Sequence, residues 1–279
     1  MSRAIYIPSA GRANRQHTFQ RIPDEFKDIT NVVVPMSEWK AYERTVGKAH
    51  LLGCPTTGIG STRQWILENT EADYVLMLDD DMYFYHRKAK GDWHLATNDA
   101  EDNVRMLARL FRLMEDKNYA HVGMATRTEA ARYLCGIRTC TRVNNVHGFD
   151  VKKVLHAQRK FDCRFDKLKL MEDFHFTLTM LEHGYANALL LDYVWNQPGS
   201  NTDGGCSAYR TAKLQAECAH ALAALHPKTV TVVTKKVKGT GSWKDMTERT
   251  DVRIQWKQAY LQSGNGPHKH WHKETKNGG

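Results

Sequence analysis

The most constraining stretch of the chain is an apolar run that ends abruptly in three acids. Residues Tyr74 to Leu78, YVLML, indicate a strand buried on both faces, and Asp79, Asp80 and Asp81 follow at its carboxyl end. Three neighbouring carboxylates repel one another, and a divalent cation held by oxygen ligands is the usual way to offset that repulsion. Because ligands of open α/β sheets bind at the carboxyl ends of strands, the triplet marks a candidate site.

A plainer interpretation of the triplet is a solvated turn, because acidic runs often end strands. The residues that follow, Met82 to Tyr85, are apolar and aromatic. The acids are therefore flanked by core on both sides, which favours a functional site over an ordinary polar loop.

Composition and charge bound the class of protein. The 279 residues are enough for one large α/β domain or two small ones, and 41% hydrophobic with 25% charged residues is typical of a globular chain. The formal net charge of +9 favours a polyanionic partner such as nucleic acid, or a small phosphorylated ligand.

Several classes are disfavoured by what the sequence lacks. No apolar run approaches the roughly 20 residues of a membrane span, and the N-terminal stretch is too short for a signal peptide, so we expect a cytoplasmic protein. None of the six cysteines forms a CxxC pair, and we expect buried thiols rather than a zinc site. The histidines of the tail, His268, His270 and His272, lie in a segment whose composition is typical of disorder.

Periodicity places the remaining elements. Apolar runs predict further strands at residues 4–7, 31–35, 121–125, 188–194 and 229–237. Helical spacing predicts helices after Ser37, from Thr62, at 101–117, at 129–134, at 151–157, from Glu172 and up to Leu225. The polar segment 86–100 is expected to be a mobile loop, 51–61 a glycine-rich loop, and 251–260 a strand or a helix.

Two turns carry candidate ligands for a nucleotide. Ser9, Gly11 and Arg12 follow the first strand, where a glycine lets the backbone approach closely and an arginine offers several donors to phosphate. Arg63 lies on the helix after the glycine-rich loop, facing the same expected site. An ordinary strand-to-loop turn explains either segment equally well.

Two further groups of charges stand out. Glu172 and Asp173 open a helix, where the helix dipole favours carboxylates even without a function. Basic residues that could contact a phosphate backbone, or could form a solvated face, are Arg127, Arg132, Arg138 and the Lys235–Lys236 region.

The order of these motifs resembles the GT-A class of nucleotide-sugar glycosyltransferases, with a DXD-type motif and a later ED motif as in family 2. The segments YIPSAGR, DDDMYFY and GGCSAYR are similar to those of the TET-associated glycosyltransferases of bacteriophages, which are thought to glycosylate hydroxymethylated pyrimidines in DNA. The resemblance covers roughly residues 4–205. It implies a Rossmann-like α/β fold with a mixed, mostly parallel central sheet, as one domain over 1–262 with a basic, flexible tail over 263–279.

The resemblance also implies roles for individual residues. The residues placed around the nucleotide sugar are Pro8, Ser9, Gly11, Arg12, Pro35, Arg63, Asp79 and Asp80. Asp81 and Asp79 are implied as residues of a Mn²⁺ or Mg²⁺ site. Asp81 would coordinate the ion, and Asp79 would contact the ribose or a water bound to the metal. Asp173, with Glu172 as the alternate, is implied as the general base. Many relatives use a C-terminal histidine as a further metal ligand; His175 is the nearest candidate here, and on a helix it could equally belong to the core.

The chemistry supports an inverting, metal-dependent enzyme. A cation bridging the diphosphate stabilises the charge that grows on the leaving group, and a carboxylate takes the proton of the acceptor hydroxyl. We expect a UDP-glucose-like donor and a hydroxymethylated pyrimidine such as hydroxymethylcytosine in DNA as acceptor. Two alternatives stay open: the same fold with a protein, lipid or polysaccharide acceptor, and a nucleic-acid-binding module without catalysis.

Overall fold

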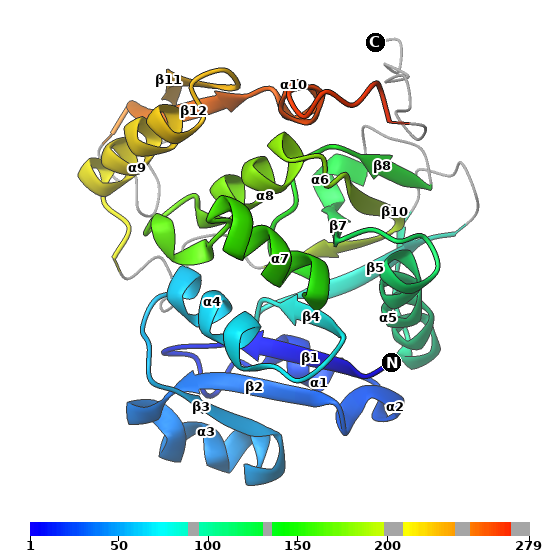
Figure 1. Cartoon of the computed structure of the whole chain (residues 1–279). Helices are drawn as coiled ribbons and strands as arrows, with labels where there is room; N and C mark the ends of the chain where they lie inside the picture. Colours follow the sequence, from blue (N-terminus) through cyan, green and yellow to red (C-terminus); the bar gives the residue numbers. More distant parts are fainter. Residues whose placement is uncertain (89–94, 131–135, 198–208, 238–245, 269–279) are drawn as a thin grey trace.

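The computed structural model describes residues 1–88, 95–130, 136–197, 209–237 and 246–268 (Figure 1). Most of these residues build one large sheet with helices packed against it, and a smaller sheet lies at the far end from α3 and β3. None of the described helices has the length and apolar character needed to cross a membrane.

In the described part of the chain, the large sheet contains ten strands in the order β3-β2-β1-β4-β9-β7-β10-β5-β6, with β8 also paired to β10. Their bounds are β1 Arg3–Pro8, β2 Thr30–Pro35, β3 Leu51–Cys54, β4 Tyr74–Leu78, β5 Tyr83–Arg87, β6 Leu95–Thr97, β7 His121–Thr126, β8 Ile137–Thr139, β9 Val146–Asp150 and β10 Asn187–Asn196. The first four strands in this order are parallel, β9 runs antiparallel between β4 and β7, and β7 is parallel to β10. The predicted mixed, mostly parallel sheet is confirmed.

The helices connect these strands and cover both faces of the sheet. Their bounds are α1 His17–Gln20, α2 Asp24–Lys27, α3 Trp39–Val46, α4 Ile59–Asn69, α5 Ala100–Glu115, α6 Arg127–Ala130, α7 Val151–Phe161, α8 Glu172–Glu182, α9 Ala212–Leu225 and α10 Trp256–Leu261, with short 3-10 turns η1 Met36–Glu38, η2 Lys48–His50 and η3 Phe165–Lys167. The start of α5 is fixed by a capping box, in which the Asp99 side chain accepts from the Asp102 amide at 2.8 Å.

Alternation along β4 explains why its run is apolar throughout. Leu76 and Leu78 belong to the core beneath α5, whereas Val75 and Met77 belong to the core beneath α4, α7 and α8. The strand is thus buried on both faces, as its sequence predicts, and its polar continuation emerges at the edge of the sheet.

A small C-terminal sheet completes the described fold. Strands β11 Val230–Lys236 and β12 Glu248–Ile254 form an antiparallel pair. Together with α9 and α10, they pack on α8 through a third core. Its buried members include Leu178 and Leu181 of α8, Leu222 of α9 and Tyr260 of α10. The segment 251–260 contains the end of a strand and the start of a helix, because β12 passes directly into α10.

The structure departs from the sequence-based expectations in several segments. The predicted mobile loop 86–100 contains the end of β5 and all of β6, and the glycine-rich segment 51–61 begins with β3. Strand β9 is an unpredicted element, because its sequence VHGFD shows neither an apolar run nor alternation. Helix α6 spans Arg127–Ala130, and the rest of the helix predicted there, with Arg132, lies outside the described residues.

Candidate active site

The first acid of the triplet, Asp79, faces a cavity at the carboxyl edge of the sheet. Its carboxylate accepts a hydrogen bond from Arg63 Nη2 at 2.7 Å and another from Asn145 Nδ2 at 2.6 Å. Asn145 precedes β9, which pairs with β4, so the neighbouring strand supplies the second donor. Asp79 is thus held by one cationic and one neutral group while it lines the cavity.

The other two acids of the triplet belong to a separate network. Arg12 Nη1 donates to Asp80 at 2.8 Å and to Asp81 at 2.9 Å. The Ser9 hydroxyl also donates to Asp80 and lies 2.8 Å from the Tyr42 hydroxyl. Neither Asp80 nor Asp81 lines the cavity. Within the described residues, Arg12 and Arg63 therefore offset the charge of the acidic triplet, and the metal ion predicted for it stays a prediction.

Burial changes the proton affinity of these two acids. Burial, followed by the charge of Asp79, raises the pKa of Asp81 to about 6, although Arg12 acts in the opposite direction. Burial likewise raises the pKa of Asp80, and its hydrogen bonds from Ser9 and Arg12 lower it. The network is therefore close to losing a negative charge under mildly acidic conditions.

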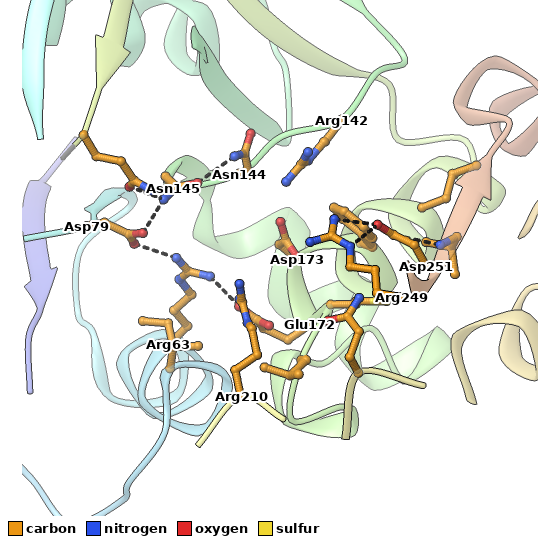
Figure 2. A pocket seen from close by; sticks show the side chains of 18 of the residues that line it. Arg63, Asp79, Arg142, Asn144, Asn145, Glu172, Asp173, Arg210, Arg249 and Asp251 are labelled. Atoms are coloured by element: carbon orange, nitrogen blue, oxygen red, sulfur yellow. Dashed lines mark hydrogen bonds and ion pairs between the residues drawn. The ribbon is translucent and has the colours of Figure 1, made fainter. Parts of the chain in front are cut away.

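Arg63 joins the triplet to the second acidic motif. Its Nη1 donates to Glu172 at 2.9 Å while its Nη2 donates to Asp79, and its side chain is only 4% exposed (Figure 2). Helix α4 brings Arg63 to this position by packing closely against η3: a Cβ at Gly60 would lie 2.6 Å from the Phe165 carbonyl oxygen. Only glycine permits that approach without displacing the helix.

Glu172 and Asp173 begin α8 and face the same cavity. Met171, immediately before them, has a left-handed backbone with φ of 64°, which turns the chain into the helix. Burial and the charge of Asp173 raise the pKa of Glu172 to about 7, against the opposing effect of Arg63. Burial also raises the pKa of Asp173, and Arg142 and Arg63 lower it. Both carboxylates thus have a higher pKa than exposed carboxylates at a helix N-terminus, where the helix dipole favours the charged form.

The cavity has a volume of about 490 Å³ and is strongly charged. Its described lining comprises Ile59, Arg63, Asp79, Arg142, Asn144, Asn145, Leu170, Met171, Glu172, Asp173, Phe174, Trp195, Gln197, Arg210, Gln215, Lys235, Arg249, Asp251, Val252, Ile254 and Trp256. In Figure 2 the Asp173 side chain lies between the Arg63–Asp79 pair and the Arg249–Asp251 pair. A carboxylate in that place can accept a proton from a molecule that enters from either side.

Some of the predicted site residues line the cavity, and the others lie outside its described lining. Arg63, Asp79, Glu172 and Asp173 meet at the cavity. The remaining predicted residues lie outside its described lining: Pro8, Ser9, Gly11, Arg12, Pro35, Asp80 and Asp81.

Among these remaining residues, Ser9 and Arg12 both donate to Asp80. Gly11 has a left-handed φ of 69°, and its amide donates to Glu38 at 2.7 Å. Pro8 and Pro35 end β1 and β2. These residues shape the edge of the sheet beside the cavity.

Sequence reasoning missed the side chains that later elements bring in. Asn145, Gln197, Arg249 and Trp256 line the cavity without having been singled out. Arg142 and Arg210, the last residue of the GGCSAYR segment, also line it but were given no role. The Asn144–Asn145 pair gave a usable signal, since asparagine tolerates the left-handed φ of 59° found at Asn145. The others could not be recognised, because the contacts that place them join segments far apart in sequence.

A divalent cation fits the donors that face the cavity. Among the described residues, no three His, Cys, Asp or Glu side chains are grouped to hold a metal ion. The Asp79 carboxylate, however, lies beside the amide groups of Asn145 and Gln197, which are hydrogen-bonded at 3.1 Å. Mg²⁺ is commonly held by one or two carboxylates together with substrate phosphates, so Asp79 could hold a cation that a diphosphate completes.

His175 is not among the described residues that line the cavity. Its Nδ1 lies 2.9 Å from His226 Nε2, and His226 Nδ1 lies 2.8 Å from Glu182. Of the two interpretations left open for His175, the structure favours the core: the chain of bonds ties α8 to the end of α9. Burial lowers the pKa of His175 to about 4, so it is neutral at physiological pH.

Comparisons with known proteins agree with the fold and with the family that the sequence resembles. Residues 3–205 match the family model of the TET-associated glycosyltransferases. No curated protein matches the sequence.

Solved structures with a similar fold include TarS 1–349 of S. aureus in complex with UDP-GlcNAc, at 14% identity and a TM-score of 0.54 over 82% of this chain and 67% of that one. TarS 1–349 in complex with UDP matches at 13% identity and a TM-score of 0.50, over 82% of this chain and 66% of that one. The chain thus spans about two thirds of these TarS chains, and the likeness confirms the GT-A fold.

Proposed function

Because the chain belongs to the TET-associated glycosyltransferases, we propose that it transfers a sugar from a nucleotide-sugar donor to the hydroxyl of a hydroxymethylated pyrimidine in DNA. The observation that carries the proposal is the position of Asp173, which lies in the cavity between the Asp79–Arg63 end and a cationic wall. One side of the base is thereby open to a donor and the other to an acceptor.

The donor end of the cavity suits a diphosphate. Arg63 supplies a guanidinium that is already oriented by Asp79 and Glu172, so little side-chain entropy is lost when an anion approaches. Asp79 would hold a divalent cation, which would supply positive charge to the departing nucleoside diphosphate. Preorganised positive charge of this kind stabilises the leaving group as its charge develops.

Asp173 takes the proton of the acceptor hydroxyl in this proposal. Among the described residues its carboxylate forms no ion pair shorter than 4.0 Å, in contrast with Glu172, which is paired with Arg63. Its raised pKa makes the deprotonated form a stronger base, and positioned proton transfer contributes about 10²–10⁴ in rate. A single base on the face opposite the leaving group implies inversion at the anomeric carbon.

The charge of the chain supports a nucleic-acid acceptor. The formal net charge is +9, and the cavity lining carries four arginines and one lysine against four carboxylates, an excess of one cation. Polyanions are attracted to such surfaces, whereas a neutral polysaccharide gains little from them. The family match also favours a glycosyltransferase over the non-catalytic binding module.

The test combines donor and acceptor arms with the purified protein. With Mn²⁺ and UDP-glucose or another nucleotide sugar, we expect slow release of nucleoside diphosphate, lost on adding EDTA. With duplexes carrying 5-hydroxymethylcytosine or 5-hydroxymethyluracil, we expect a mass increase of one hexose, absent from unmodified DNA. Donor hydrolysis without transfer to either duplex would exclude the DNA acceptor, and activity that EDTA leaves unchanged would exclude the metal.

A further inference from the structure

The C-terminal sheet forms a wall of the catalytic cavity, although it follows the part of the chain that matches the family. That match ends at residue 205. The later residues that line the cavity are Arg210, Gln215, Lys235, Arg249, Asp251, Val252, Ile254 and Trp256. The wall is anchored to the catalytic helix α8 by the third core and by an edge-to-face contact of Phe174 with Trp256 at 5.7 Å. It is therefore a fixed part of the site.

Two cations on this wall face each other across the strand pair. Lys235 on β11 and Arg249 on β12 are direct partners in the register. Like charges in that relation destabilise a sheet. Asp251 ion-pairs with both, at 3.2 Å to Lys235 and 2.7 Å to Arg249, so a single carboxylate is shared by two cations. The described groups at this place are thus two cations and one carboxylate.

Arg210 and Arg142 add to the positive charge of this region. Both line the cavity, and among the described residues neither forms an ion pair. Arg142 lies over the Phe174 ring, with its guanidinium carbon 4.7 Å from the centroid, and it lowers the pKa of Asp173. After residue 205, the chain thus contributes three cations and one carboxylate to the lining, an excess of positive charge. These groups are Arg210, Lys235, Arg249 and Asp251.

The wall lies on the acceptor side of the general base. Figure 2 shows Arg249 and Asp251 on one side of Asp173, and Asp79 and Arg63 on the other. In a direct displacement the base contacts the attacking hydroxyl, which approaches from the side opposite the leaving group. If the diphosphate lies at Asp79, the molecule that brings the hydroxyl lies against β11 and β12.

We propose that this wall binds a backbone phosphate of the acceptor strand, next to the modified base, through Lys235 and Arg249. The inference rests on the proposed function, since it takes DNA as the acceptor. Arginine offers a planar fork that matches phosphate oxygens, and lysine adds a mobile point charge. Lys236 and Arg253 lie on the same two strands, but neither of these two residues lines the cavity. Position on the wall, and not basic character alone, selects the two binding residues.

The test compares two double variants of the full chain. Lys235→Gln with Arg249→Gln removes the wall cations, and Lys236→Gln with Arg253→Gln is the matched control on the same strands. Binding of a fluorescein-labelled duplex with one 5-hydroxymethylcytosine is measured by anisotropy over a range of KCl concentrations. Each lost phosphate contact lowers the slope of log Kd against log salt by about 0.9. The wall variant loses its contact with one phosphate, so we expect a decrease of about 0.9 for it and none for the control.

Steady-state kinetics supply the second readout. We expect the acceptor KM of the wall variant to rise at least tenfold, with a much smaller change in donor KM. Equal salt slopes in the wall variant and the control would overturn the inference. A rise in donor KM that matches or exceeds the rise in acceptor KM would also overturn it, because the wall would then bind the donor diphosphate.

A milder variant guards against misfolding. Lys235→Gln alone affects a side chain that is 49% exposed and leaves the Arg249–Asp251 pair intact, and we expect it to lower the salt slope by less than the double variant does. Its Tm should equal that of Lys236→Gln.

The salt slope is independent of turnover: a duplex that binds through the wall but is never glycosylated supports the inference while the proposed acceptor fails. A wild-type chain that binds no duplex overturns the inference.

Discussion

The two acidic motifs of this protein differ in what surrounds them. Asp80 and Asp81 are held by Arg12 and Ser9 in a network outside the described lining of the cavity, whereas Glu172 and Asp173 face the cavity directly. Asp79 belongs to the first motif by sequence and to the second by position, because Arg63 ties it to Glu172.

The difference separates two uses of carboxylates at the edge of a sheet. In the Asp80–Asp81 network, every acid contacts a guanidinium, which suits a role in fixing the loop after β1 against the end of β4. In the Glu172–Asp173 pair, burial raises both pKa values, and Asp173 is left without a short ion pair among the described residues. We therefore expect mutations in the first group to affect stability, and mutations at Asp173 to affect turnover.

The largest expected effect is on catalysis at Asp173. Asp173→Asn keeps the shape of the side chain but cannot accept the proton, and we expect the rate of sugar transfer to fall by about 10²–10⁴. Quenched-flow or steady-state transfer assays measure the loss, with Asp28→Asn, an exposed residue at the end of α2, as the control. A variant that keeps more than a tenth of the wild-type rate would remove Asp173 from its assigned role.

Arg63 connects the two motifs, so its removal should cost the most stability. Arg63→Met leaves Asp79 and Glu172 without their shared cation, and we expect the free energy of unfolding to fall by about 3–5 kcal/mol. Urea denaturation measures the change. Arg105→Met is the matched control, because Arg105 also pairs with two acids but is 51% exposed, and its loss should cost about 0–1 kcal/mol. Equal losses in the two variants would contradict the claim that burial makes Arg63 special.

A smaller loss of stability is expected in the Arg12 network. Asp80→Asn removes the negative charge that Arg12 and Ser9 contact, and we expect a loss of about 1.5–3 kcal/mol. Thermal denaturation of Asp80→Asn is compared with Asp166→Asn, whose ion pair with Arg164 is about one-third exposed on both sides. If Asp80→Asn proved as stable as wild type while its donor KM rose, the Asp80 network would belong to substrate binding and the contrast drawn here would fail.

The smallest effect expected is the dependence of transfer on pH. The proposed general base, Asp173, must be deprotonated, and burial raises its pKa as well as that of Glu172, so the rate should fall as the pH is lowered, with a midpoint above the ordinary value of an exposed aspartate. The pH profile of kcat/KM measures this limb, with a correction for any loss of folded protein.

The variant Glu172→Gln removes a negative neighbour and frees Arg63 to act on Asp173. Both changes favour the charged carboxylate, so the midpoint of the limb should move to lower pH. A midpoint near 4 in the wild type, or an upward shift in the variant, would show that the base is not a buried carboxylate of this pair.

Much of the site could be predicted from sequence, because its parts follow strong local patterns. The apolar run before Asp79 indicated a buried strand, and the acids at the start of α8 stood out against the apolar residues around them. Each pattern fixes what its own segment does, and the edge of the sheet then brings these segments together.

The assignment of Arg12 and the composition of the far wall depended on distant contacts. Arg12 was expected at a phosphate, but its guanidinium contacts Asp80 and Asp81, about 70 residues along the chain. The pairing of Lys235 with Arg249 depends on the register of a strand pair, which no local pattern specifies. Strand β9 was missed because a buried histidine, His147, is accommodated there by stacking on His121 at 5.4 Å.

The close packing at Gly60 has a consequence for how this enzyme tolerates change. Any side chain at that position would meet the Phe165 carbonyl oxygen, so even one methyl group would push α4 outward. The guanidinium three residues later would withdraw with the helix from both carboxylates that it bridges. Gly60 lies outside the described lining of the cavity, yet its lack of a side chain governs the alignment of the proposed catalytic residues.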